Sequence, residues 1–463
     1  MKTLKRVLAL TLCVTLLFGI CGCAALNGDT GFDTGAGGFP LPPMIGSSGG
    51  SEEFDGSFSP DTYPDSSESD VESGGDLDES KEDVTEDDAE EIKRPAGLIT
   101  AGAWDDNKYF EEWKKLFEQS SEENTAGKFV NYTGNNSWGL DSYKRIKVTV
   151  GLSSDESAKV AGAMVVAKNE NAETVFEAVT DANGVAYLFT DNETRTITVT
   201  SGAYTATADY IEESGDEIFI KLDGNAEKKN IIDIMFVVDV TGSMGDELYF
   251  LKNELADVID KVASGSANTA INLSLLFYRD DGDDEKFAYT DFTNVTDLSG
   301  LAAIQAALDS QRASGGGDYP EAVDEALMLA VGKQWNTAAT TKLIFHVLDA
   351  PPHSKAADKE RYKSAVEAAA AKGIRICPIL CSGAENLTEY LVRQAAIYTG
   401  GTFIFVTDDS GIGNSHHDPE LPNVTVELLN SLLVRLITGY HSGEFAPPVY
   451  WKTDQANNQS NQG

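Results

Sequence analysis

The sequence predicts a mixed α/β protein. Its main domain is a doubly wound, mostly parallel sheet, preceded by a small antiparallel β-sandwich and a disordered N-terminal tether. From about residue 230, continuous apolar runs alternate with helical stretches, as expected for strands covered on both faces. Residues 144–224 contain short, alternating, β-branched segments between turn sequences, which is typical of a sandwich. Residues 23–94 hold few large apolar side chains and cannot form a core.

The composition limits the possible partners. The chain has 463 residues, which favours two or three domains, and 75 acidic against 35 basic residues give a net charge of −40. Such a surface could bind nucleic acid only through a dense basic patch, and the sequence has none, so we expect no nucleic-acid partner. The charge favours cationic partners or cations themselves.

The N-terminus has the features of an export signal. Basic residues precede an apolar run at residues 7–20, which is shorter than the roughly 20 residues of a permanent membrane span. The run ends in "ICGC", which resembles the lipobox of bacterial lipoproteins. This resemblance implies that residues 1–22 are a signal peptide and that Cys23 carries a lipid. The protein would then be held at the bacterial cell membrane by this anchor only, facing the extracellular or periplasmic side. The alternative is a secretory signal cut after Ala25.

Three further segments surround or precede the main domain. The tether at residues 23–94 is strongly acidic, and its self-repulsion should keep it extended. Residues 95–143 are predicted to be a helical segment, because aromatic residues in "LITAGAWDDNKYFEEWKKLFEQ" recur at spacings of three and four. We expect this aromatic stripe to dock on the domain that follows. Residues 442–463 are predicted to be a disordered tail.

The sandwich region has a family resemblance of its own. The strings "GAMVVAKN" and "AVTDANGVAYL" are similar to the carboxypeptidase regulatory-like β-sandwich. The resemblance covers about 80 residues and implies a structural spacer. Nothing in this region resembles a peptidase site.

The α/β domain is predicted to span residues 229–441. A short segment at residues 286–293, "KFAYTDFT", is expected to be an antiparallel edge strand. Cys377 and Cys381 stand four residues apart on one predicted strand, too far apart for a disulfide, and are expected to be core residues. In open α/β sheets, ligands bind beyond the carboxyl ends of the strands. The residues that follow predicted strands there are Asp239, Asp280, Asp349 and Asp408.

The stretch "DVTGSM" places three oxygen-bearing side chains at one of these strand ends. Asp239, Thr241 and Ser243 are spaced two apart, so in extended backbone they point toward one side. Carboxylate and hydroxyl oxygens are ligands for a hard divalent cation. The same residues are also good helix caps, so this stretch alone leaves both interpretations open.

This stretch resembles the Asp-x-Ser/Thr-x-Ser signature of the von Willebrand factor type A domain. Members of that family bind a divalent cation at an adhesion site built from three loops. The resemblance implies that Asp239, Thr241 and Ser243 form the first loop. In the second, "SGGGDYPEAVDEAL" is similar to a variant subgroup in which a carboxylate, here Asp318, stands where the family usually has a threonine. In the third, "FHVLDAPPH" supplies Asp349.

The resemblance also implies a function. The cation would be Mg²⁺, with Ca²⁺ or Mn²⁺ as alternatives, and its open position would take an Asp or Glu carboxylate of a protein partner. The extra carboxylate of Asp318 would weaken that demand. The predicted function is metal-dependent protein binding or adhesion, and the alternative is an assembly or regulatory subunit of a cell-envelope complex. We expect no enzyme activity, because the sequence lacks phosphate-loop, zinc-protease and nucleophile-elbow motifs.

Several residues are predicted to line the rim of the site or lie behind its ligands: Asp280, Asp281, Ser314 and His353. For the acidic loop "YRDDGDDEK" a solvated loop is favoured over a second cation site, because it lacks the complete EF-hand spacing. His346 is expected to be a core histidine, and the adjacent pair His416 and His417 is expected in a surface loop.

Overall fold

The computed structural model describes residues 96–119, 126–134, 137–190, 193–211, 215–224, 230–265, 268–411 and 414–460. The predicted signal peptide at 1–22, the anchor candidate Cys23 and the tether lie outside the described residues. Within the described part, no helix is both long and apolar enough to cross a membrane.

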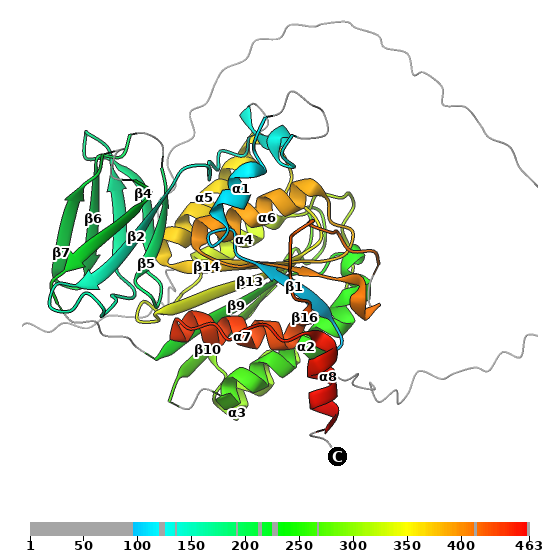
Figure 1. Cartoon of the computed structure of the whole chain (residues 1–463). Coiled ribbons are helices and arrows are strands. Elements are labelled where there is room, and N and C mark those ends of the chain that lie inside the picture. Colours follow the sequence, from blue (N-terminus) through cyan, green and yellow to red (C-terminus); the bar gives the residue numbers. More distant parts are fainter. Residues whose placement is uncertain are drawn as a thin grey trace, which may run out of the picture. The chain divides into compact units, whose positions relative to one another are not determined.

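Among the described residues, nine strands form the central sheet of the α/β domain, in the order β11-β10-β9-β13-β14-β15-β1-β16 with β12 beside β10 (Figure 1). The middle strands pair in parallel, which confirms the predicted fold class: β10 (Ala270–Tyr278), β9 (Ile231–Asp239), β13 (Thr341–Leu348), β14 (Ile374–Leu380) and β15 (Phe403–Val406). The outer strands pair antiparallel: β11 (Phe287–Tyr289), β12 (Thr293–Asn294), β1 (Thr100–Trp104) and β16 (Glu427–Leu428). The expected edge strand at 286–293 is confirmed by β11.

Helices cover both faces of this sheet (Figure 1). One core contains residues of α2 (Gly245–Gly265), α3 (Leu298–Asp309) and α7 (Leu429–Ser442). The other contains residues of α4 (Val323–Gly332), α5 (Ala356–Lys372) and α6 (Asn386–Thr399). Along β9, Phe236 and Val238 belong to the first core and Met235 and Val237 to the second. Because side chains alternate along a strand, a strand buried on both faces must be apolar throughout.

The β-sandwich is also present, in two sheets ordered β5-β2-β8 and β4-β3-β6-β7. Its strands are β2 (Arg145–Leu152), β3 (Met164–Lys168), β4 (Thr174–Val179), β5 (Val185–Phe189), β6 (Thr196–Ser201), β7 (Tyr204–Asp209) and β8 (Glu217–Leu222). One pair departs from the expected antiparallel arrangement, because β2 and β8 run parallel. The sandwich packs on α6 through Tyr398, whose ring stacks on Phe189 at a centroid distance of 4.5 Å.

The predicted helical segment at 95–143 is wrong in its first part. Residues Thr100–Trp104 form β1, which lies between β15 and β16 in the large sheet. Its small residues suit that position: a side chain at Gly102 would overlap the ring of Phe405. The carboxylate of Glu254 on α2 accepts hydrogen bonds from the backbone N–H groups of Gly97, Leu98 and Ile99, which holds the start of the strand.

Only a short helix, α1 (Phe110–Lys115), follows β1 in this segment, with a 3₁₀ turn, η1, at Val130–Tyr132. The aromatic stripe does pack, but largely on α6 of the α/β domain. Trp113 lies against Phe129, and Phe129 lies 5.5 Å from Tyr390 between ring centroids. The periodicity therefore identified an apolar face, although most of the segment is not helical.

The tail at 442–463, expected to be disordered, contains the helix α8 (Trp451–Ser460). Its start is tied to the domain, because the backbone N–H of Trp451 donates to the carbonyl of Val426 at 3.0 Å. The hydroxyl of Ser431 on α7 donates to the carboxylate of Asp454 at 2.6 Å. These contacts with distant residues stabilise a polar helix that has no apolar periodicity of its own. Cys377 and Cys381 are buried and are not joined by a disulfide, as predicted.

Candidate metal site at the carboxyl edge of the sheet

The carboxyl ends of the parallel strands bring acidic residues to one edge of the sheet. Asp239 is the last residue of β9, Asp349 follows β13 directly, and Asp280 lies two residues beyond β10. Asp408, which begins the 3₁₀ turn η5 (Asp408–Ser410) after β15, pairs with Nδ1 of His416 at 2.8 Å. The first three residues therefore surround the site, and Asp408 serves a neighbouring loop.

The first loop holds its side chains through its own hydrogen bonds. Oδ1 of Asp239 accepts from the backbone N–H of Thr241 at 2.9 Å and from its hydroxyl at 2.7 Å. The hydroxyl oxygens of Thr241 and Ser243 lie 3.3 Å apart. Ser243 belongs to the 3₁₀ turn η4 (Gly242–Met244), which leads directly into α2. The three oxygen-bearing side chains predicted from "DVTGSM" are thus brought together.

Backbone hydrogen bonds join the three loops. The N–H of Gly242 donates to the carbonyl of Gly315 at 3.1 Å, and the N–H of Ser314 donates to the carbonyl of Val240 at 3.0 Å. The N–H of Glu321 donates to the carbonyl of Pro351 in the third loop at 3.0 Å. Because these contacts involve backbone atoms, the relative positions of the loops depend little on their side chains.

Arg279, directly after β10, fastens the second loop from behind. Its guanidinium donates to the carbonyl oxygens of Ser314, Glu285 and Arg312 at 3.0–3.1 Å. Every one of these bonds goes to a backbone carbonyl, so the guanidinium positions the loop and forms no ion pair with the described carboxylates of the site.

Four carboxyl side chains at this edge are almost fully buried. Asp239 is 0% exposed, Asp280 is 3% exposed, and Asp349 and Glu321 are each 4% exposed. Oδ2 of Asp239 and Oε2 of Glu321 are buried and accept no hydrogen bond within the described part of the chain. Buried polar atoms are normally paired, so these two oxygens point to a missing positively charged or hydrogen-bonding group.

Burial and mutual repulsion shift the titration of these groups. Burial, reinforced by the charge of Asp349, raises the pKa of Asp239 to about 7. The nearby Tyr278 hydroxyl acts in the opposite direction, but its hydrogen bond is with Nε2 of His346 at 3.2 Å. Burial also raises the pKa of Glu321 to about 9, with contributions from Asp239 and Asp280. Without a cation, the site therefore retains protons at neutral pH.

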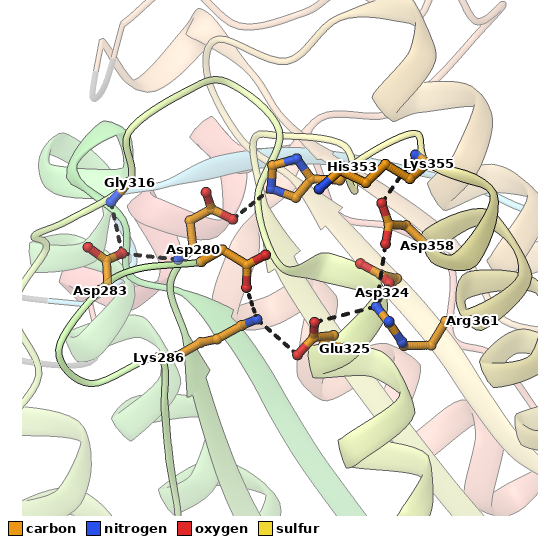
Figure 2. A network of polar contacts seen from close by, with 11 residues as sticks. Asp280, Asp283, Lys286, Gly316, Asp324, Glu325, His353, Lys355, Asp358 and Arg361 are labelled. Atoms are coloured by element: carbon orange, nitrogen blue, oxygen red, sulfur yellow. Dashed lines mark hydrogen bonds and ion pairs between the residues drawn. The ribbon is translucent and has the colours of Figure 1, made fainter. Parts of the chain in front are cut away.

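The predicted rim residues lie in the network of Figure 2 or beside it. Nε2 of His353 is 2.9 Å from Oδ1 of Asp280 (Figure 2), and these two residues and Asp318 offer ligand atoms that all lie within 4.8 Å of one another. Asp283 accepts hydrogen bonds from the backbone N–H groups of Asp280 and Gly316. Asp281 forms an ion pair with Lys286, which also pairs with Glu325 at 2.9 Å.

Glu321 is the site residue that the sequence analysis missed. A signal was present: it follows Pro320 in the "GGGDYPE" string and stands three residues from Asp318, the carboxylate chosen there. Its spacing did not show which of the two carboxylates points inward. His346 is a buried core histidine as expected, and burial lowers its pKa to about 3.

His416 and His417 lie in a loop with exposed neighbours, as predicted, but their own side chains are largely enclosed. The His416 side chain is only 3% exposed and lies between Asp408 and Glu247, with Nε2 3.4 Å from the Glu247 carboxylate. Nε2 of His417 lies 2.7 Å from the carboxylate of Glu389 on α6. Both histidines therefore fasten their loop to carboxylates that lie far away in the sequence.

The residues present fit a hard divalent cation. Carboxylate and hydroxyl oxygens converge from separate loops, and two buried oxygens lack a hydrogen-bond donor. Asp239, Thr241, Ser243 and Asp349, with a carboxylate of the second loop, would hold the ion. When bound, the ion would supply a positive charge that these groups lack.

Comparison with known proteins agrees with this geometry. The family model of the von Willebrand factor A domain matches residues 233–408. A putative ariadne-like RING finger protein of Acanthamoeba polyphaga mimivirus is 25% identical over 223 residues, which are 45% of this chain and 21% of that protein. This chain thus spans about a fifth of the length of that relative.

Two solved structures give weaker similarities. The conserved hypothetical protein BatB from Bacteroides thetaiotaomicron is 16% identical, with 38% of this chain and 90% of that chain covered and a TM-score of 0.29. The open conformation of the pilus adhesin SpaC from Lactobacillus rhamnosus GG is 13% identical, with 70% and 38% covered and a TM-score of 0.33. On the family match, the signature at Asp239 and the strand order, this chain contains a von Willebrand factor A domain.

Proposed function

We propose that this chain binds a protein partner through a divalent cation held at the three-loop site. A von Willebrand factor A domain fits a protein-interaction role. The observation that carries the metal requirement is the pair of buried, unpartnered oxygens, Oδ2 of Asp239 and Oε2 of Glu321. Burying carboxylates without a positive charge is costly, and a divalent cation removes that cost.

The proposed role of the site is binding rather than turnover. Thr241 and Ser243 contribute neutral oxygens, which leave more positive charge on a bound ion than carboxylates do. Ser243 is exposed, so one side of the site faces the surface where a partner group can approach. Mg²⁺ is the proposed ion, with Mn²⁺ and Ca²⁺ as alternatives.

Calorimetric titration tests this proposal directly. Wild type and Asp239→Ala are titrated with Mg²⁺, Mn²⁺ and Ca²⁺ after removal of bound metal with EDTA. We expect one site in the wild type and none in the variant. If the wild type binds none of the three ions, the metal-binding proposal fails and only the fold assignment remains.

The partner is sought by capture from membranes with Mg²⁺ or EDTA present. Adhesion predicts a ligand released by EDTA and not retained by Asp239→Ala. A stable endogenous complex that survives EDTA would contradict the adhesive role and favour an assembly subunit of the cell envelope.

We also propose that Cys23 anchors the chain to the bacterial membrane and that the sandwich is a spacer of the carboxypeptidase regulatory-like type. The support is the "ICGC" string and the turn and strand pattern at 161–188. Labelling cells with an alkyne fatty acid should mark the wild type but not Cys23→Ala. Equal labelling of both would contradict the anchor.

A further inference from the structure

The second loop carries two carboxylates three residues apart, and the structure separates them. Asp318 is exposed, whereas Glu321 is 4% exposed. The sequence pattern alone favours Asp318 as the metal ligand. The contacts of the two side chains lead to a different assignment.

The position of Glu321 is set by its backbone and by a glycine. Its N–H donates to Pro351, and Glu321 forms an isolated parallel bridge with Pro352, so the residue is held against the loop that carries Asp349. A Cβ placed on Gly316 would lie 2.8 Å from Oε1 of Glu321 and 3.2 Å from Cβ of Thr241. The absence of a side chain at Gly316 thus leaves room for the Glu321 carboxylate beside the first loop.

Asp318 lies in different surroundings. Its carboxylate is grouped with Asp280 and with His353, whose Nε2 is 2.9 Å from the Asp280 carboxylate. Asp280 is itself only 3% exposed and faces His353 in Figure 2, whereas Asp318 is exposed. Asp318 therefore has neighbours that can share its charge or hydrogen-bond to it.

The charged groups that most affect Glu321 are all acidic. Asp239 acts on it most strongly among its neighbours, followed by Asp280, Asp349 and Asp283. Its Oε2 is buried and has no hydrogen-bond partner among the described residues. A buried carboxyl group that faces other carboxylates either keeps its proton or needs a positive charge placed between them.

We propose that Glu321, and not Asp318, is the second-loop ligand of the cation, and that the loaded site binds a neutral oxygen from a basic segment rather than an Asp or Glu side chain. This inference rests on the proposed function. Asp239, Asp349 and Glu321 place three carboxylates around a doubly charged ion, so the loaded site keeps a net negative charge. A further carboxylate would be repelled, whereas an amide or carbonyl oxygen flanked by lysine or arginine would be attracted.

Matched variants test the ligand assignment. Mn²⁺ binding is measured by calorimetry in wild type, Glu321→Gln and Asp318→Asn, with circular dichroism as the check on folding. Glu321→Gln should weaken Mn²⁺ binding by about tenfold or more, because it removes one ligand charge, and Asp318→Asn should change it by about twofold or less.

The outcomes separate the two claims. If wild type binds no Mn²⁺, the proposed function fails and this inference fails with it. If wild type binds Mn²⁺ but Asp318→Asn is the weaker of the two variants, the inference alone is overturned. Equal affinities for wild type and Glu321→Gln overturn it as well.

The partner class is tested with acetate as the probe. Water-proton relaxation of the Mn²⁺-loaded protein reports whether acetate displaces water from the ion, and sodium chloride of equal ionic strength is the control. We expect acetate to leave the water-proton relaxation rate of wild type unchanged and to lower that of Glu321→Gln. In the variant, removal of one carboxylate restores the attraction of the ion for acetate. A fall in wild type at the same acetate concentration would overturn the exclusion of acidic partners.

Discussion

Two buried acidic clusters of this molecule differ in what neutralises them. In the Arg393 cluster (Asp106, Lys128, Glu389, Arg393 and His417), the Arg393 guanidinium lies 2.6 Å from Asp106 and 2.8 Å from Glu389. Lys128 and His417 each approach Glu389 to 2.7 Å. At the three-loop site, Asp239 and Glu321 have no ion pair with a Lys or Arg among the described residues.

The pKa values of Glu389 and Glu321 show the consequence of this difference, whereas burial outweighs Arg393 at Asp106 and raises its pKa. Burial by itself raises the pKa of Glu389, but His417, Arg393 and Lys128 outweigh it and lower the pKa overall. No cation opposes burial at Glu321, and its pKa rises to about 9. Burial alone therefore does not mark a metal site. A buried carboxylate oxygen that lacks both a protein cation and a hydrogen-bond donor, as at Asp239 and Glu321, is the better indication.

The largest effect expected is in the Arg393 cluster. Arg393→Met leaves Asp106 and Glu389 buried without their main cation and should lower the free energy of unfolding by about 3–5 kcal/mol. Urea unfolding measures it. The control is Lys115→Met, which breaks a pair with Glu112 that is about half exposed and should leave the free energy of unfolding almost unchanged. Equal losses of unfolding free energy in both variants would show that the buried Arg393 cluster stabilises the fold no more than an exposed ion pair does.

A bound cation should stabilise the buried carboxylates of the three-loop site, as Arg393 stabilises those of its cluster. At a hundred times the dissociation constant, Mg²⁺ should raise the free energy of unfolding by about 2.7 kcal/mol. Asp239→Asn should lose this gain and, in EDTA, be no less stable than wild type, because it removes a repelled charge. An Asp239→Asn variant that is destabilised in EDTA but still stabilised by Mg²⁺ would contradict the comparison.

The pH dependence of the metal-free protein should follow from the same site. Asp239 and Glu321 have folded-state pKa values raised to about 7 and about 9. Their stabilising contribution is fully present below the unfolded values of 3.8 and 4.5 and is lost as the pH rises through 7 and 9. The melting temperature in EDTA should therefore fall between pH 5 and pH 9.

Two controls sharpen this measurement. Glu321→Gln should flatten the upper part of the pH profile, and saturating Mg²⁺ should remove most of the fall. Glu389 has a lowered pKa, so its contribution is present above the unfolded value of 4.5 and is lost only in more acidic solution. A metal-free melting temperature that rises toward pH 9 would contradict the raised pKa values.

The smallest effect is expected at the edge of the Arg393 cluster. His417→Ala removes one of three groups that approach Glu389 and leaves Arg393 and Lys128 in place. It should cost about 0.5–1 kcal/mol in urea unfolding. A loss as large as that of Arg393→Met would mean that the three groups are not redundant.

The sequence predicted the parts of the molecule that depend on local periodicity. The central strands were predicted because residues facing both cores must be apolar, as in β9. Asp239 and Asp349 were predicted because parallel strands bring their carboxyl ends to one edge. By contrast, β1 was missed, because its strand conformation depends on β15, where Ala101 pairs with Val406 across about 300 residues.

The contacts of the two histidines and the helix α8 were not predicted, for a related reason. His416 and His417 are fastened by Glu247 and Glu389, and α8 is tied to Val426 and Ser431. Each of these partners lies outside the few residues over which a periodic pattern can be seen. A polar segment without a local pattern resembles a loop until its distant contacts are known.

The sequence by itself determined the α/β fold, the edge of the sheet that carries the site, and the first and third loops that supply it. Those features follow from apolar periodicity and strand direction, which are local properties of the chain. Only the tertiary structure decided that Glu321 is buried beside Thr241 while Asp318 stays exposed. Side-chain direction in a loop depends on the space left where loops meet, here between Gly316 and Thr241, and that space exists only after the loops have come together.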